Sequence, residues 1–262
     1  QPPVKEYALT KGLAVYQPLQ VRDADTLELV QSLSPDLIVV AAYGKVLPEE
    51  ILDTPQYGSI NVHSSLLPKY RGAAPINWAI LNGETETGVS IMYMAKELDA
   101  GDIILQKTTA IRETENAQEL TERLAELGAQ ALSQAVTELT EGKAVRTPQA
   151  AEKATYAAML SREMSTIDWN RSAHEISCQV RGLIPWPTAV TELGGNRCKV
   201  FSTSVLDATT SAAPGTILAA GKEGIQVACG GGTVLRIDEL QADGGKRMKA
   251  ADYLRGHPLS LG

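Results

Sequence analysis

The sequence predicts an α/β protein: an open, mostly parallel, Rossmann-like sheet followed by a small β-barrel of the OB-like type. Helix and strand patterns alternate through residues 1–141, which is typical of an open α/β sheet. Residues 36–44 (DLIVVAAYG) form a continuous apolar, β-branched run, as expected of a strand that a parallel sheet buries on both faces. After residue 183, short strand patterns separated by glycine pairs replace this alternation. Such spacing indicates a small barrel.

In the first half, capping residues, glycine and proline set the element boundaries. A long helix is predicted where apolar residues recur at spacings of three to five: Leu120, Leu124, Leu127, Leu132, Ala135 and Leu139. The elements predicted before it are helix 4–12, a short strand within 13–21 that ends at Pro18, helix 23–35, strand 36–44, helix 48–55, strand 58–66, helix 73–83, strand 88–94 and strand 102–111. Since sites gather beyond the carboxyl ends of the strands of such a sheet, the strand ends are the places to search.

The character of the sequence changes at Gly142, and we expect three parts. Residues 1–141 form a catalytic domain, 142–160 a linker without helical or strand periodicity, and 161–262 a carboxyl-terminal β-barrel domain. The elements predicted in the last part are helix 172–183 and strands 189–193, 198–206, 215–221, 224–230 and 233–240.

Composition predicts a soluble cytoplasmic protein. The chain is 44% hydrophobic, yet it has no apolar stretch approaching the roughly 20 residues that span a membrane and no apolar region typical of a signal peptide near its start. Three widely spaced cysteines, Cys178, Cys198 and Cys229, indicate buried thiols of a reducing compartment. No HExxH, P-loop or GxGxxG pattern is present, so we expect no metal and no nucleotide-phosphate site.

The charge is unevenly distributed along the chain. Residues 1–141 carry 10 Lys and Arg against 20 Asp and Glu, whereas residues 142–262 carry 14 against 11. An acidic half joined to a mildly basic half can mark a module that faces a polyanion. An excess of three positive charges is a weak signal, and a chance imbalance of surface charge explains it better.

The most informative stretch is Ser59–Ile76 (SINVHSSLLPKYRGAAPI). Residues two apart on a strand project from the same face, so Asn61 and His63 would lie side by side where the predicted strand meets a loop. An amide that can donate to a developing oxyanion, beside an imidazole that can move a proton, suffices for acyl transfer. The alternative is an ordinary polar strand end.

Asp99, in ELDAGD, follows the next predicted strand. At converging strand ends its carboxylate could orient the imidazole of His63, or it could simply favour the turn at Ala100 and Gly101. The loop 65–72 could line a pocket for a flat, partly anionic ligand, or only cross the sheet edge. His174 and His257 have no evident partner and are expected on the surface.

These residues resemble the folate-dependent formyltransferases. The motifs that carry the resemblance are INVHSSLLPKYRGAAPI, LDAGDII, ATYAAML, IDWNRSAHEI, VRGLIPWP and GKRMKAADYLRG, spread over essentially the whole chain. The RGAAPI form of the loop is similar to that of the branch whose acceptor is methionyl-tRNA, and the second half is similar to that branch's carboxyl-terminal domain.

The resemblance implies transfer of the formyl group of 10-formyltetrahydrofolate to the α-amino group of methionyl initiator tRNA, by a monomer without metal or membrane. It places Asn61, His63 and Asp99 on the catalytic positions. It places Ser65, Leu66, Leu67 and Pro68 on the segment that contacts folate, with Tyr43 and Gly44 beside the pterin pocket. We further expect the mildly basic second half to contact tRNA phosphates through Lys246, Arg247 and Lys249.

Members of the family begin with a further strand–helix–strand unit, whereas this sequence starts at Gln1. We therefore expect a fragment with exposed apolar edges on the strand patterns DLIVVAAY and GSINVHSS. Three alternatives remain open from the sequence: formyl transfer to a small amine, hydrolysis of the formyl group, and a non-catalytic fragment that binds folate or RNA.

Overall fold

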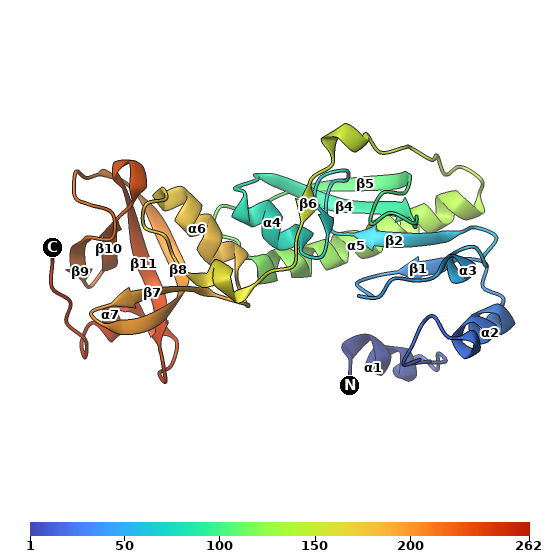
Figure 1. The fold of residues 1–262 in the computed structure, drawn as a ribbon, viewed down its shortest axis with the longest axis horizontal. Helices are drawn as coiled ribbons and strands as arrows, with labels where there is room; N and C mark the ends of the chain where they lie inside the picture. The colour runs from blue at the N-terminus through green and yellow to red at the C-terminus, as the bar shows by residue number, and fades with distance from the viewer. The chain divides into compact units, whose positions relative to one another are not determined.

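The structure, a computed structural model, describes residues 1–262 (Figure 1). The chain divides into two compact units, Gln1–Asn61 and Val62–Gly262. The division falls within one strand, β2 (Ser59–His63). No helix is both long and apolar enough to cross a membrane.

The first unit contains short elements joined by long irregular segments (blue in Figure 1). They are α1 (Pro3–Thr10), α2 (Ala24–Leu33), β1 (Ile38–Val40), α3 (Glu49–Leu52) and the start of β2. The Asp23 side chain caps α2 by accepting from the amide of Thr26, as N-cap residues do. β1 pairs in parallel with β2, with Val39 opposite Ile60.

Two predictions for this unit need correction. Residues 13–21 form no strand; Pro18 has no amide hydrogen to offer a ladder, and no neighbouring strand pairs with the segment. The strand predicted at 36–44 shortens to three residues and is not buried on both faces, because Val39 is 42% exposed. The exposed apolar edge expected on DLIVVAAY is present, whereas Ile60 of β2 is fully buried.

The second unit opens with the end of β2, which is followed in strand order by β4 (Glu86–Tyr93) and β5 (Ile103–Ala110). β4 and β5 pair antiparallel, so the sheet is mixed and the expectation of a mostly parallel sheet is not confirmed. A turn at Ala100–Gly101 lets β5 return beside β4, and its shortness excludes the helical crossover that a parallel pair needs. α4 (Pro75–Leu81) and the short β3 (Arg71–Gly72) connect β2 to β4.

The predicted long helix is α5 (Ala117–Thr140), and it packs on β4 and β5. A capping box between Asn116 and Glu119 begins it and satisfies amides that the first helical turn leaves without partners. Gly128 lets the helix approach the sheet closely, since a β-carbon there would lie 3.1 Å from a methyl of Val62.

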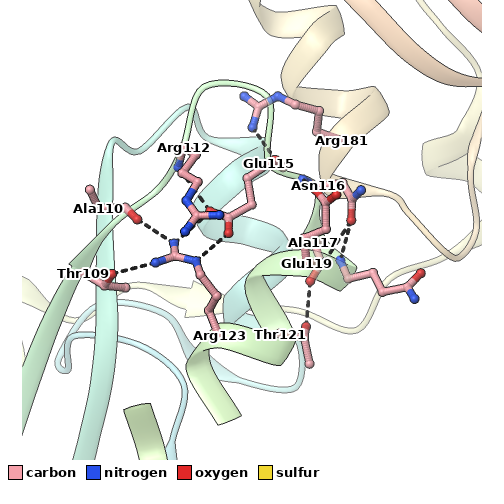
Figure 2. A network of polar contacts seen from close by, with 11 residues as sticks. Thr109, Ala110, Arg112, Glu115, Asn116, Ala117, Glu119, Thr121, Arg123 and Arg181 are labelled. Atoms are coloured by element: carbon pink, nitrogen blue, oxygen red, sulfur yellow. Dashed lines mark hydrogen bonds and ion pairs between the residues drawn. The ribbon is translucent and has the colours of Figure 1, made fainter. Parts of the chain in front are cut away.

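A buried ion pair stabilises the turn before α5 (Figure 2). The Glu115 carboxylate, 2% exposed, accepts from the guanidinium of Arg123 at 2.6 and 2.8 Å. Arg123 also donates to Thr109 Oγ1 and to the carbonyl of Ala110 at the end of β5. From α6, Arg181 donates to the carbonyl of Glu115 at 2.9 Å, so this one turn joins α5, β5 and α6.

The carboxyl-terminal part contains α6 (Ala173–Gly182) and one antiparallel sheet (Figure 1). The remaining elements are η1 (Ala151–Lys153), β6 (Tyr156–Ala157), η2 (Arg162–Ser165), β7 (Ala189–Leu193), β8 (Asn196–Thr209), β9 (Ile217–Gly221), β10 (Gly224–Ala228), η3 (Gly230–Gly232), β11 (Thr233–Ala242), β12 (Met248–Lys249) and α7 (Ala250–Tyr253). Ile176 and Val180 of α6 are buried against the sheet in one apolar core.

The predicted closed barrel is not confirmed. The strand order is β7-β8-β11-β10-β9, with β12 paired to β11, so β7 and β9 remain edges and do not pair with each other. The register shifts along the pairing of β8 with β11 are bulges that bend and twist a sheet. Here the bent sheet packs with α6 and α7 around one apolar core, but it does not close into a barrel. All three cysteines are free and buried, as predicted.

The segment predicted as a linker without regular structure is held along the sheet of the second unit. Thr147 exchanges backbone hydrogen bonds with Ile103 at 2.8 and 2.9 Å. β6 pairs in parallel with β3, with Tyr156 opposite Arg71. The hydrophobic periodicity of the sequence did not predict these contacts, because each involves only one or two residues.

Candidate active site

The end of β2 carries the two residues that the sequence singled out. Asn61 and His63 lie two apart on this strand; Asn61 is half-buried and His63 is buried. Within the second unit, the structure brings His63 together with Asp99, whose carboxylate Oδ2 lies 3.7 Å from Nδ1 of the ring. The side chains are 6% and 11% exposed, so this pair is shielded from bulk water.

The other ring nitrogen of His63 also faces an acceptor. Nε2 lies 2.9 Å from the carbonyl oxygen of Tyr70, and a carbonyl can only accept. Nε2 can therefore donate to this carbonyl, whereas the Asp99 carboxylate at 3.7 Å from Nδ1 lies beyond direct hydrogen-bonding distance. The carbonyl contact on one side and the carboxylate on the other restrict the orientation of the imidazole.

Asp99 is held in an uncommon backbone conformation, with φ of +50°, which a residue other than glycine adopts at some cost in free energy. Its Oδ2 atom accepts from the amide of Gly72 at 2.8 Å. The following turn is tight: a β-carbon at Gly101 would lie 1.9 Å from the carbonyl oxygen of Tyr93. Asp99 therefore does more than favour a turn, because its side chain joins the His63 loop to its own.

Tyr70 supports the same loop. Its hydroxyl donates to Glu84 at 2.8 Å and accepts from Asn82 at 3.1 Å, and burial raises the pKa of Tyr70 to about 12. The phenol thus stays protonated and keeps its hydrogen bond to Glu84. Lys69 also donates to Glu84 at 2.9 Å, which ties the loop to the turn after α4.

The predicted folate-contacting segment Ser65–Pro68 follows directly. Ser65 and Leu67 are buried, while Leu66 and Pro68 are half-buried. Ser90 and Gln106 bind this backbone: Ser90 Oγ donates to the carbonyl of Ser65 at 2.6 Å, and Gln106 donates to that of Leu67 at 3.0 Å. Any ligand contact of this segment would be made by the outward surfaces of Leu66 and Pro68.

The other two predicted folate residues, Tyr43 and Gly44, belong to the first unit and are both exposed. The φ of Gly44 is +71°, a conformation that favours glycine. In that unit they lie in an irregular segment after β1, and Lys45 beside them donates to the carbonyl of Leu19 at 2.9 Å.

Two supporting residues were not predicted. The carbonyl of Tyr70 is a partner of His63, and a backbone acceptor gives no sequence signal. Gln149, in the predicted linker, donates to the carbonyl of Asp99 and accepts from Arg71. A single glutamine in a segment without periodicity likewise gives no sequence signal.

The predicted tRNA-contacting residues Lys246, Arg247 and Lys249 are all exposed. Arg247 forms an ion pair with Glu239 and lies over the ring of Phe201 at 4.7 Å. Lys249 lines a shallow cavity of about 240 Å³, whose other charged lining residues are Lys222, Glu223, Asp238 and Glu239.

His174 and His257 are exposed, as predicted, but both have partners. His174 lies 3.6 Å from the Cys178 thiol, and His257 stacks on Tyr253.

Both halves of the chain match models of known protein families. The model described as formyl transferase matches residues 1–136, and that described as formyl transferase, C-terminal domain, matches residues 159–258. Among curated relatives, the methionyl-tRNA formyltransferase of Trichlorobacter lovleyi is 49% identical, over 100% of this chain and 82% of its own length. That of Bacillus subtilis is 48% identical with the same coverage.

Solved structures share the fold at lower identity. An N-formyltransferase from Helicobacter canadensis, solved with folinic acid and dTDP-3-aminofucose, has a TM-score of 0.71 at 17% identity, covering 88% of this chain and 81% of its own. HypX from Aquifex aeolicus with tetrahydrofolic acid has a TM-score of 0.64 at 19% identity, covering 87% and 40%. Two formyl transferase models match most of the chain, and a methionyl-tRNA formyltransferase is 49% identical to it over the whole length of this chain. The chain therefore belongs to the formyl transferase family.

Proposed function

We propose that this chain transfers the formyl group of 10-formyltetrahydrofolate to the α-amino group of methionyl initiator tRNA, for translation initiation. The observation that carries the proposal is the 49% identity to a methionyl-tRNA formyltransferase over 261 residues. The match extends through the carboxyl-terminal domain, over 100% of this chain. The buried His63–Asp99 pair supplies the acid–base group that amine acylation requires.

The reaction begins with attack of the neutral amine on the formyl carbon. Free α-amines titrate near pH 7.7–8.0, so a substantial neutral fraction exists near neutral pH. The attack creates a tetrahedral oxyanion. The amide of Asn61 donates to that oxygen, a contact worth about 10²–10³ in rate in comparable sites.

His63 accepts the proton that the attacking amine must lose, directly or through a water molecule, and its protonated form stabilises the oxyanion. When the intermediate collapses, the carbonyl re-forms, the bond between the formyl carbon and N10 breaks, and the proton passes from His63 to N10 of the departing tetrahydrofolate. Asp99 orients the ring from the Nδ1 side. General acid–base assistance of this kind contributes about 10²–10⁴ in rate. Because the Tyr70 carbonyl faces Nε2 in the structure, the ring or the loop must shift when substrate binds, which is common between free and substrate-bound sites.

The segment Ser65–Pro68 suits a flat ligand. Its backbone is fixed by Ser90 and Gln106, and Leu66 and Pro68 retain apolar surface outside the core. In this proposal they contact the folate, with Tyr43 and Gly44 beside the pterin. Bound 10-formyltetrahydrofolate supplies the formyl group; the proposed residues need no metal.

An acceptor comparison tests the proposal. Purified chain is given 10-formyltetrahydrofolate with methionyl initiator tRNA, with a dTDP-amino sugar, or with water alone, and formylated product is measured. The fold shared with the Helicobacter canadensis enzyme makes the sugar nucleotide the matched alternative. We expect formylmethionyl-tRNA as the main product. Preferential formylation of the sugar nucleotide, or release of formate without an acceptor, would contradict methionyl-tRNA as the acceptor.

A salt titration tests the role proposed for the basic residues. If Lys246, Arg247 and Lys249 contact phosphates, log affinity for tRNA falls by about 0.7–0.9 for each phosphate neutralised per unit of log salt concentration. Lys249→Ala should lower this slope by about one contact. A tRNA affinity that does not change with salt would contradict the assignment.

A further inference from the structure

We propose that Gln149, in the segment between the two family domains, is a positioning residue that holds Asp99 beside His63. In this proposal, the segment that contains Gln149 is part of the structure that positions the catalytic pair. Only the turnover measurements below rest on the proposed function; the hydrogen-exchange measurement does not.

The Gln149 side chain uses its whole hydrogen-bonding capacity on the two loops of the site. Its Nε2 group donates to the carbonyls of Asp99 and Gly101, both at 2.8 Å. Its Oε1 atom accepts from Nε and Nη2 of Arg71 at 3.0 and 2.7 Å. One side chain thus bridges the loop that carries Asp99 and the strand that follows the His63 loop.

The partners dictate which end of the amide faces which loop. A carbonyl only accepts and a guanidinium only donates, so the reversed amide would face two acceptors with its oxygen and a cation with its hydrogens. Glutamate would keep the Arg71 contact but place an acceptor against the two carbonyls. Among residues of this length, glutamine is the one that satisfies both sides.

The contact acts where Asp99 needs support. With φ of +50°, Asp99 is in a left-handed conformation that aspartate tolerates better than most residues but still at some cost in free energy, so contacts that hold its backbone matter. Gln149 binds the carbonyl of Asp99, and the amide of Gly72 binds its carboxylate at 2.8 Å. Since Arg71 is 5% exposed and precedes Gly72, the Gln149–Arg71 contact fixes the donor of that second bond as well.

The same segment also binds the His63 side of the site. The Thr155 hydroxyl accepts from the amide of Tyr70 at 2.9 Å, and the Thr155 carbonyl accepts from the amide of Arg71 at 2.8 Å. Tyr70 is the residue whose carbonyl faces Nε2 of His63. Residues of one segment therefore hold the partners of both ring nitrogens.

The test compares Gln149→Ala and Gln149→Glu with Gln179→Ala. Gln179 is a matched control: its side-chain amide is buried and donates to two backbone carbonyls, those of Met164 and Thr166, at 2.8 and 3.0 Å, and it contacts neither His63 nor Asp99. If the glutamines contribute only to stability, the Gln149 variants and Gln179→Ala all have a lower melting temperature and nothing else changes. A positioning role changes the catalytic pair in the Gln149 variants alone.

The first measurement is hydrogen exchange at the Gly72 amide, followed by NMR. We expect faster exchange in Gln149→Glu than in the parent chain, because the Asp99 carboxylate leaves its place. Gln179→Ala should leave the rate unchanged. Equal rates in all variants would overturn the proposal whether or not the chain is active.

The second measurement is steady-state formyl transfer. A misplacement of about 1 Å can cost about 10²-fold in rate, so we expect kcat to fall about tenfold in Gln149→Ala and further in Gln149→Glu. KM for both substrates should stay within about threefold, and kcat of Gln179→Ala within about twofold. In an Asp99→Ala background, Gln149→Ala should have little further effect. Additive losses would overturn the proposal.

The two measurements separate the two hypotheses. If Asp99→Ala turns over normally, the catalytic role of Asp99 fails, and exchange at Gly72 still decides whether Gln149 positions it. If Asp99→Ala is slow but Gln149→Ala is as fast as the parent chain, the proposed function stands and the positioning role fails.

Discussion

The first unit, Gln1–Asn61, and the second, Val62–Gly262, bury their apolar side chains very differently. In the first, the buried apolar side chains are Val21, Ile51 and Ile60. Large side chains exposed in the same unit are Val4, Tyr7, Leu9, Leu13, Tyr16, Leu19, Leu33, Val39, Tyr43 and Val46. In the second unit, one core cluster alone joins sixteen buried residues around α6, and further clusters surround Leu67 and Tyr70.

This difference teaches that secondary structure and stability are separate properties of a segment. α2 has a good N-cap at Asp23 and lies within the range 23–35 that its sequence predicts, yet Thr26 is its sole buried residue. Capping contributes about 1 kcal/mol, whereas each fully buried aliphatic side chain contributes about 1.5–3 kcal/mol. We therefore expect the second unit to provide most of the free energy of unfolding.

The largest test of this comparison is truncation of one strand residue in each unit. Ile91→Ala in β4 removes a fully buried side chain and should cost about 3–4 kcal/mol. Val39→Ala in β1, where the side chain is 42% exposed, should cost less than about 1 kcal/mol. Chemical denaturation measures both, and similar losses would contradict the difference.

A second test asks whether burial also decides the value of ion pairs. Glu115→Gln removes the charge of the buried partner of the half-buried Arg123 (Figure 2) and should cost about 1.5–3 kcal/mol, the range for hydrogen bonds to charged groups. The control is Glu141→Gln, whose partner Lys143 is 70% exposed, and this change should stay within about 0.5 kcal/mol.

The buried pair also predicts a dependence of stability on pH. Burial raises the pKa of Glu115, but the hydrogen bonds and charge of Arg123, with the Arg112 amide, outweigh it and lower the pKa below the ordinary 4.5. A lowered pKa means that the stabilisation is complete above about pH 4.5 and is lost as pH falls through the folded-state value. The free-energy difference between parent and Glu115→Gln should therefore shrink below that pH. A difference constant down to about pH 3 would contradict this.

The smallest expected effect, expressed as a free energy, is on turnover, and it is tested with one residue from each unit. Asn61→Ala and Asp99→Ala should each lower kcat at least tenfold, about 1.4 kcal/mol, while far-ultraviolet circular dichroism stays unchanged. We expect Asn61→Ala to act through the oxyanion alone and Asp99→Ala through the orientation of His63. Near-normal turnover in either variant would remove the role assigned to that residue.

The sequence predicted most of what depends on local pattern. The apolar stripe of α5, the capping of α2 and the strand that carries Asn61 and His63 all follow from residues within a few positions of one another. The strand predicted at residues 13–21 was wrong because a strand requires a partner, and nothing local shows whether one exists. The predicted barrel was not confirmed for the same reason: closure depends on whether the edge strands β7 and β9 meet.

By itself, the sequence determined the family, most of the longer elements and the placing of Asn61 and His63 two residues apart on one strand, because these depend on residue identity and on local periodicity. Only the tertiary structure decided that Asp99 lies 3.7 Å from His63, that the Tyr70 carbonyl binds the other ring nitrogen, and that Gln149 bridges the two loops. These contacts join residues between 7 and 78 positions apart. Hydrogen bonds at such separations follow from how the chain folds back on itself, which no local pattern specifies.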